Sequence, residues 1–370
     1  MTRRPRSLAE RPLLRSRLPQ RPHGLPERPD VLARAPSARN LPGVDPLSDV
    51  LRAVRLTGAY FYRVEAAGQW SILAVASREV VPRLLPETDH LIPYHILTAG
   101  RCWGGVAGEP AVLMEPGDVV VFPHGDSHVM SSDGGDRANP PVFSSAPPHS
   151  GTVYFGPGAQ RDTSLVCGFL GFDARPYNPL LASLPRCLHL RAVTGGWLAE
   201  FPRQVVSESR TSRVGSESML TRMAELMFVE CLRRHAEHLA SQQRGWLAAL
   251  ADPVVGAALV ELHARPAHPW TLADLARAVA SSRTVLAERF ARYVGLPPMQ
   301  YLTQWRLQLA AEQLVRGTAK VAAIAAQVGY ESEAAFSRAF KRATAHSPGE
   351  WRRARSTATQ PQAPAAPARS

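Results

Sequence analysis

Two short segments of the sequence place polar side chains on one side of an expected helix and a pair of apolar side chains on the other. Leu286 and Phe290 lie four residues apart, as do Phe336 and Phe340, so each pair points to one side of a helix. Arg338 is the strongest candidate for reading bases, because its guanidinium can donate two hydrogen bonds to O6 and N7 of guanine. The full set of residues expected to face base edges is Arg283, Thr284, Ala287, Glu288, Glu333, Ala334, Ser337 and Arg338.

Basic residues close to these segments are suited to bind the phosphates of DNA, which positions a protein without reading sequence. The expected phosphate contacts are Arg292, Lys341, Arg342 and Arg352. Residues 268–355 and residues 1–40 each carry a net charge of +7, whereas residues 41–267 carry −3. Basic ends around a mildly acidic middle favour a polyanionic partner. For residues 1–40, the arginine bias of a GC-rich genome explains the excess equally well.

The helices that would hold these residues have recognisable capping signals. Ser282 and Ser332 are suited as N-caps, Thr271 and Asp274 form a capping box, and Gly329 is suited as a left-handed C-cap. Each serine-capped helix follows a shorter helix across a tight turn, which is a helix-turn-helix. The sequence therefore predicts two such units.

The two units repeat at a fixed offset. Ser282 and Ser332 lie 50 residues apart, and so do Pro298 and Pro348. A helix from Met299 to about Arg316 would hold the units at a constant distance. One chain could then reach two major-groove segments roughly 34 Å apart. A repeat of generic helical hairpins is the alternative, but it leaves the coincidence of caps, apolar pairs and prolines unexplained.

Residues 252–353 resemble the DNA-binding domain of the AraC/XylS family of bacterial transcription regulators. The motifs that carry the resemblance are SRTVLAERF at 282–290, GYESEAAFSRAFKR at 329–342 and SPGEWR at 347–352. The resemblance implies recognition helices at about 283–294 and 333–344. Two residues depart from the family pattern. Glu288 stands where a basic or amide residue is frequent, and Ala345 stands where a helix-ending glycine is expected. The second recognition helix is therefore expected to end differently from the first.

From about residue 45 to residue 190 the pattern is typical of strands, with short apolar runs at 70–75, 94–97, 119–122 and 164–169 separated by Gly, Pro and Asp. Residues 134–160 are predicted to be an insertion loop. The stretch GDVVVFPHGDSH at 117–128 resembles the second cupin motif, and the region is similar to the sensor domains of cupin-containing AraC-type regulators. The residues expected to line an effector pocket are His95, Cys102, Trp103 and His128.

A metal-dependent cupin enzyme also needs a first motif with two histidines. Its expected position holds Pro86, Glu87 and Thr88, so no metal or other cofactor is predicted, and a non-standard set of His95, His128 and a carboxylate stays open. The competing interpretation makes both histidines hydrogen-bonded interior residues. Cys102 is either an oxidant-sensing thiol or a buried inert one. The four cysteines are far apart and form no CxxC pair, which predicts neither a zinc site nor a disulfide framework.

The sequence thus predicts an α+β multidomain protein with a cupin-like β-barrel, a helical linker and an all-α double helix-turn-helix domain. The expected divisions are a disordered Arg/Pro-rich extension at 1–44, the sensor barrel at 45–192, a helical linker or dimerisation region at 193–250, the DNA-binding domain at 251–355 and a disordered tail at 356–370. No stretch approaches the roughly 20 apolar residues of a membrane helix, and a cytoplasmic location is expected.

The expected function is sequence-specific DNA-binding transcription regulation, as an activator under an effector or stress signal, without enzymatic activity. The expected partners are double-stranded promoter DNA, RNA polymerase, a small-molecule effector and a second copy of the chain. Two alternatives are a metal-dependent cupin enzyme with a helical appendage and a nucleoid-type protein that binds DNA by charge alone.

Overall fold

The computed structural model describes residues 45–53, 56–85, 88–134, 142–143, 151–158, 160–172, 176–192, 197–211, 213–239 and 244–356. The expected extension at 1–44 lies outside the described residues, and so does the expected tail at 356–370 except for Ser356, which ends the last helix. Among the described helices, none is long and apolar enough to cross a membrane.

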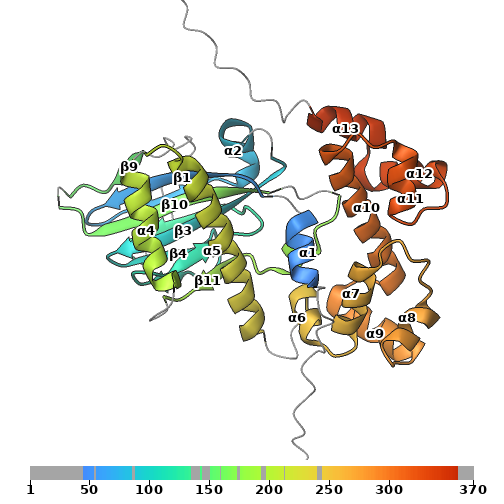
Figure 1. The fold of residues 1–370 in the computed structure, drawn as a ribbon. Coiled ribbons are helices and arrows are strands. Elements are labelled where there is room, and N and C mark those ends of the chain that lie inside the picture. Colours follow the sequence, from blue (N-terminus) through green and yellow to red (C-terminus); the bar gives the residue numbers. More distant parts are fainter. Residues whose placement is uncertain are drawn as a thin grey trace, which may run out of the picture. The chain divides into compact units, whose positions relative to one another are not determined.

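Two β-sheets form the amino-terminal half of the described chain (Figure 1). Most strand pairs are antiparallel, and the two exceptions pair β1 with β9 and β2 with β8. In spatial order, the six-stranded sheet consists of β11 (Leu188–Leu190), β6 (Val119–Val121), β3 (His90–Ala99), β10 (Thr163–Phe172), β1 (Leu56–Ala66) and β9 (Thr152–Phe155). The five-stranded sheet consists of β5 (Val112–Met114), β4 (Cys102–Val106), β7 (His128–Ser131), β2 (Ser71–Ala74) and β8 (Val142–Phe143).

The predicted apolar runs coincide with strands β2, β3, β6 and β10. The prediction of an insertion loop at 134–160 is wrong in part, because β8 and β9 lie within it and each pairs in parallel with a strand of the barrel. These two strands are only two and four residues long, and the Pro- and Gly-rich sequence around them hides so short a strand signal.

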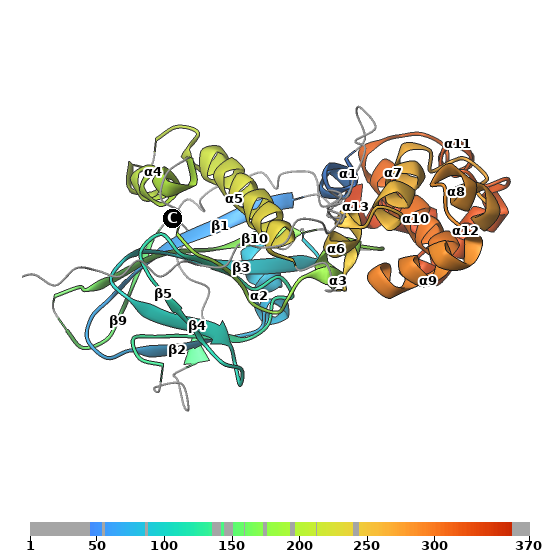
Figure 2. The same cartoon turned by 90° about the horizontal axis from the view of Figure 1, so that it is seen from below.

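The six-stranded sheet is apolar on both faces, which accounts for the nearly continuous apolar sequence of β10. Along β3 and β10, alternate residues belong to two separate apolar clusters. Leu97 and Leu165 pack in the barrel interior, whereas Ile96 and Val166 pack on the outer face. Helices α4 (Trp197–Thr211) and α5 (Ser216–His238) cover that outer face (Figure 2).

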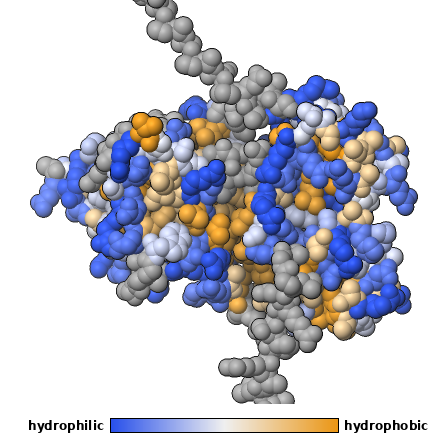
Figure 3. All heavy atoms as spheres, viewed as in Figure 1, coloured by the Kyte–Doolittle hydropathy of each residue, from blue (hydrophilic) through white to orange (hydrophobic). Residues whose placement is uncertain are grey.

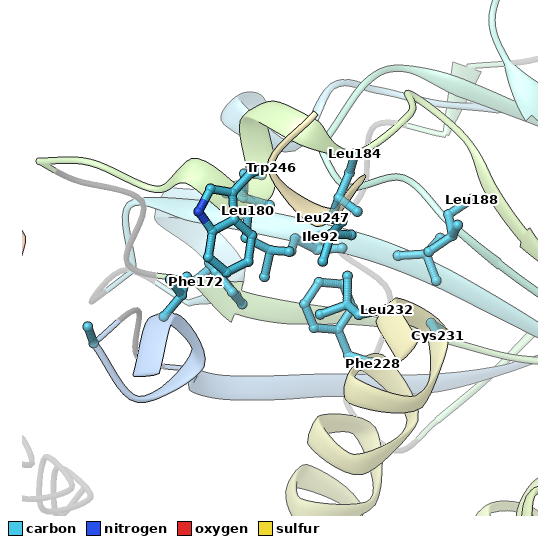
Figure 4. Packing of buried hydrophobic residues seen from close by; sticks show 14 of the residues in the cluster. Ile92, Phe172, Leu180, Leu184, Leu188, Phe228, Cys231, Leu232, Trp246 and Leu247 are labelled. Carbon is cyan, nitrogen blue, oxygen red and sulfur yellow. The ribbon is translucent and has the colours of Figure 1, made fainter. Parts of the chain in front are cut away.

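The contact between the sheet and α5 is made by large side chains. Phe172 of β10 meets Phe228 of α5 edge to face, with ring centroids 5.7 Å apart, and Ile92 and Leu232 lie beside them (Figure 4). The apolar residues of α5 therefore fall into a buried group and an exposed group. Leu232 is fully buried, whereas the side chains of Met219 and Leu226 are 54% and 58% exposed. Apolar patches are visible over α4 and α5 in the space-filling view (Figure 3).

The other helices are shorter, apart from α10. They are α1 (Pro46–Ala53), α2 (Ser77–Leu84), α3 (Pro179–Ser183), α6 (Trp246–Ala251), α7 (Val255–Ala264), α8 (Leu272–Ala278), α9 (Arg283–Val294), α10 (Pro298–Arg316), α11 (Val321–Gln327), α12 (Glu333–Thr344) and α13 (Pro348–Ser356). Helix α10 runs between the pair α8–α9 and the pair α11–α12 (Figure 1). The predicted connector helix and both predicted recognition helices are thereby confirmed as helices.

Candidate DNA-binding interface and barrel site

Serine caps start both recognition helices. The Ser282 hydroxyl accepts a hydrogen bond from the Val285 amide at 3.2 Å, and the Ser332 hydroxyl accepts one from the Ala335 amide at 3.2 Å. Each cap satisfies an amide that the first helical turn leaves without an intrahelical partner. The first helix of the first unit has the predicted cap as well, because the Thr271 hydroxyl accepts from the Asp274 amide at 3.1 Å.

The two units are superimposable in their recognition helices but differ in the turn. Helices α9 and α12 are offset by 50 residues, whereas α8 and α11 are offset by 49. The turn of the second unit is therefore one residue longer. Gly329 provides the left-handed conformation in that turn with a φ of 85°, and Ala280 provides it in the first unit with a φ of 51°.

The expectation that α12 ends differently from α9, because Ala345 replaces a glycine, is wrong. Gly295 ends α9 with a φ of 79°, and Ala345 ends α12 with a φ of 63°. In both caps the amide bonds to a carbonyl four residues earlier. Alanine therefore adopts the left-handed cap at a cost that its side chain imposes and a glycine would avoid.

The apolar pairs of both recognition helices are fully buried, as the spacing predicts. Leu286 and Phe290 pack in one cluster, and Phe336 and Phe340 pack in another. Of the predicted base-reading residues, the structure leaves Arg283, Thr284, Glu288, Glu333, Ala334 and Arg338 exposed, and Ala287 and Ser337 partly exposed. The predicted set thus lies outside the cores, on the helix surface that a DNA groove could meet.

One residue of α9 was missed by the sequence argument. The Val285 side chain is 43% exposed, although it is apolar and sits in the first turn of the helix. An exposed apolar side chain at this position is suited to contact the methyl group of thymine. The sequence contains a signal for this exposure, because Val285 directly precedes the inward-pointing Leu286 and adjacent residues of a helix point in different directions.

The predicted phosphate contacts separate into two groups. Arg292, Lys341 and Arg342 are exposed. Arg352 has a different environment, because its Nε and Nη2 donate to the carbonyls of Leu314 and Ala319 at 3.2 and 2.6 Å. These bonds tie α13 to the end of α10 and the loop after it, so the geometry gives Arg352 a bracing role within the domain.

In the barrel, the pairing of β3 with β10 places His95 beside Cys167, and His128 of β7 in the other sheet lies against His95. His95 Nε2 lies 2.8 Å from His128 Nε2, and His95 Nδ1 lies 2.8 Å from Cys167 Sγ. The His128 ring also stacks on Phe122, with centroids 4.0 Å apart. The predicted His95 and His128 therefore meet, and Cys167 joins them where the sequence argument had named Cys102.

One main-chain carbonyl sets the directions of these hydrogen bonds when both buried histidines are neutral. His128 Nδ1 lies 3.0 Å from the Asp126 carbonyl, so it must carry a proton and donate. His128 Nε2 then accepts from His95 Nε2, and His95 Nδ1 accepts from the Cys167 thiol. Tyr62 completes the chain by bonding Cys167. All four side chains are neutral in this arrangement.

Burial keeps these groups neutral, since a charged form would lose its hydration. It lowers the pKa of His128 to about 4 and lowers the pKa of His95 well below its ordinary value, with the neighbouring His128 as a second cause. Burial also raises the pKa of the Cys167 thiol well above its ordinary range. A small cavity of about 30 Å³ adjoins these hydrogen-bonded side chains. It is lined by apolar residues together with His95 and Cys167.

Of the residues predicted to line an effector pocket, His95 lines this cavity, whereas His128, Cys102 and Trp103 do not. Neighbouring residues of a strand point to opposite faces, and in β4 the Cys102 side chain is fully buried while Trp103 is partly exposed. Burial, followed by the charge of Asp118, raises the pKa of the Cys102 thiol to about 12. Of the two alternatives for Cys102, the geometry supports the buried inert thiol.

The donor groups in the barrel do not fit a metal centre. His95 directs its two nitrogens at different neighbours, so His95, His128 and Cys167 do not converge on one point. The nearby carboxylates are engaged elsewhere, with Asp118 accepting from His189 Nε2 at 2.9 Å and Asp126 bonded to Arg186. Among the described residues, no group of three His, Cys, Asp or Glu side chains is arranged to hold a metal ion. The set of His95, His128 and a carboxylate is therefore not assembled.

A larger hollow of about 290 Å³ lies on the outside of the barrel beside α2, and it is polar. Its charged groups already serve the fold. Arg186 pairs with both Asp126 and Glu109, and His124 bonds the Leu184 carbonyl at 2.9 Å. The hollow thus offers few uncommitted groups to a ligand.

Comparison with known proteins agrees with both halves of this description. A family described as Cupin matches residues 45–237, and one described as a helix-turn-helix domain matches residues 275–354. A putative AraC-like transcription regulator of Streptomyces antibioticus is 34% identical over 84% of this chain and 99% of that protein. The RCS-specific HTH-type transcriptional activator RclR of Escherichia coli is 29% identical over 71% of this chain and 84% of that protein.

Among solved structures, the DNA-binding domain of AdpA, a global transcriptional factor in complex with a target DNA, is similar to this chain. It is 26% identical and covers 30% of this chain and 99% of that one, with a TM-score of 0.28. A cupin-type sheet domain joined to two helix-turn-helix units defines a DNA-binding transcription regulator. On the similarity to the Streptomyces antibioticus relative over most of both chains, the protein belongs to the AraC family of such regulators.

Proposed function

We propose that the protein is a sequence-specific transcriptional activator that binds promoter DNA through α9 and α12 and responds to an effector or stress signal at the barrel. The observation that carries the DNA-binding part is the paired recognition helices. Each buries two apolar side chains and leaves an arginine exposed, Arg283 in α9 and Arg338 in α12. The proposed domain boundaries are those that the sequence predicts, with residues 251–355 as the DNA-binding part. The proposed location of the protein is the cytoplasm.

Within this interface, we assign base reading to the exposed side chains of α9 and α12 and phosphate binding to Arg292, Lys341 and Arg342. Val285 is added as a thymine contact. Glu288 is exposed beside them and can accept from N4 of cytosine, although it also repels phosphate. Readout by α12 is therefore expected to contribute more than readout by α9.

The test selects bound sequences from a random duplex library with the full-length protein and then measures affinity for the selected site and a scrambled one by fluorescence anisotropy. Three phosphate contacts predict a salt slope of about −2.7, which lowers affinity about 40-fold between roughly 50 and 200 mM salt. Enrichment of no sequence, with equal affinity for both duplexes, would favour binding by charge alone.

Activation is tested by transcription in vitro with RNA polymerase on a template that carries the selected site upstream of a promoter. An activator raises the amount of transcript, and a fall would instead make the protein a repressor. The name of the Escherichia coli relative, a transcriptional activator, supports the first outcome.

Signal control through the barrel is supported by the cavity beside His95 and Cys167. A cavity of about 30 Å³ has room for about one water molecule, so a larger effector must widen it. Ala74 lines the cavity from β2, and Ala74→Leu fills it. In a reporter strain grown with a panel of carbon sources and oxidants, Ala74→Leu is expected to abolish the response while operator affinity stays within about twofold. An unchanged response would place signal control elsewhere.

A further inference from the structure

Helix α10 contributes to two separate apolar cores, and Arg306 lies at the boundary between them. Tyr301 and Trp305 pack with the first helix pair, and the ring of Tyr301 lies 5.6 Å from that of Phe290. Leu307 and Leu314 pack with the second helix pair. The two cores share the partly buried Leu309 of α10 but no fully buried residue, so the angle between the helix pairs depends on α10 and on the contacts beside it.

The Arg306 side chain bridges this boundary with three hydrogen bonds. Its Nε donates to the Pro266 carbonyl at 2.7 Å and its Nη2 to the His268 carbonyl at 2.8 Å, both in the loop that leads into α8. Its Nη1 donates to the Gly329 carbonyl at 3.2 Å, in the turn between α11 and α12. One planar guanidinium thus holds main-chain atoms of both units at fixed positions.

The two segments that Arg306 joins are also in close contact. A Cβ atom at Gly329 would lie 2.6 Å from the Ala267 carbonyl oxygen and 2.9 Å from Arg306 Nη2. Gly329 is therefore required for this approach as well as for its positive φ of 85°. The turn of the second unit rests directly on the loop before the first.

We infer that Arg306 is a positioning residue that sets the spacing at which the two recognition helices read DNA. The inference rests on the proposed function. Two units that enter neighbouring major-groove segments sit roughly 34 Å apart. A tilt of about 10° over half that distance moves one helix by about 3 Å, close to the ~3.4 Å between base pairs. Small changes at Arg306 therefore alter which spacing of half-sites fits.

The test uses the full-length protein and selection from a random duplex library. Wild-type protein is expected to enrich two half-site motifs separated by one fixed gap. Arg306→Met removes all three donors, so it is expected to enrich the same motifs with gaps spread over two or more lengths. Its affinity for the wild-type operator should fall about tenfold, while the preference within each half-site is unchanged.

The matched control is Arg316→Met, in the same helix, because Arg316 is exposed and pairs only locally with Glu312 at 2.7 Å. It should keep the single gap. Arg306→Lys provides a second variant that retains the charge but offers a single nitrogen in place of the separate Nε, Nη1 and Nη2 donors, and it should also broaden the gap.

Three results would overturn the inference. The first is a folded Arg306 variant that keeps one fixed gap, and the second is a variant whose half-site motifs themselves change. The third is failure of both variants to fold by circular dichroism, which would make Arg306 a residue of folding alone. If wild-type protein enriched no motif, the proposed function would fail and the inference with it.

Discussion

Replacing Arg338 with alanine separates base reading from stability. Arg338 is exposed on α12, and its guanidinium has no partner among the described residues. The substitution therefore removes no contact within the protein, and the free energy of unfolding should stay within about 0.5 kcal/mol of wild type. If Arg338 makes a bidentate contact with guanine, losing that contact costs about 1–3 kcal/mol of binding. This corresponds to an affinity loss of about 5- to 150-fold.

The assay is fluorescence anisotropy on the selected operator and on versions in which each guanine is replaced in turn. Wild-type protein should lose affinity at one particular guanine, and Arg338→Ala should be indifferent to that same replacement. Lys341→Ala is the matched control, because Lys341 is exposed on the same helix. As a phosphate contact it should weaken binding to all duplexes alike and reduce the salt slope by about 0.9.

The reasoning is refuted if Arg338→Ala retains wild-type affinity and preference. It is refuted equally if Arg338→Ala lowers affinity for every duplex by one common factor, since that would make Arg338 a phosphate contact. A large loss of stability in this variant would show that Arg338 supports the fold, contrary to its exposure.

Three further predictions concern the fold and the barrel. Ser332→Ala should lower the free energy of unfolding by about 1 kcal/mol in urea titrations, because the cap of α12 is lost; unchanged stability would remove that role. Burial lowers the pKa of His128 to about 4 and also lowers that of His95, so the unfolded chain binds protons first. Stability should then fall as pH drops below about 6.5, by up to about 1.4 kcal/mol per pH unit for each histidine, and the contribution of His128 should end at about pH 4; a flat profile would contradict this. Cys102 should react with iodoacetamide at least about tenfold more slowly than the half-buried Cys187, and equal labelling in mass spectrometry would show that the barrel opens.

The recognition units were predictable because their signals are local. The serine caps and the apolar pairs four residues apart each depend on neighbours within one helix or turn, and the repeat at 50 residues places the same local signals twice in the chain. The bounds of α9 and α12 agree with the segments that the family resemblance implies, and the serine caps mark where both helices begin. The ending of α12 was not predictable, since Ala345 adopts a left-handed conformation that alanine disfavours and that the residue type does not signal.

The barrel site could be predicted only in part, because it depends on which strands pair. His95 and Cys167 are 72 residues apart and meet through the antiparallel pairing of β3 with β10. No local pattern marks Cys167 as the partner of His95. Cys102 was named as the candidate thiol instead, because it stands beside Trp103. The same limit applies to α5, where the helical period cannot tell which apolar residues the sheet will cover.

Side chains of β3 point alternately into the barrel interior and toward the outer face of the sheet, so this strand separates the two apolar cores. His95 faces the cavity, while its neighbours Tyr94 and Ile96 belong to the cluster that α5 covers. A molecule that pushed His95 aside would have to shift the backbone that carries these neighbours, and interiors packed as densely as crystals transmit such a shift. A displacement of His95 inside the barrel would therefore reach α5 through the adjacent residues of β3, without a series of intervening side chains.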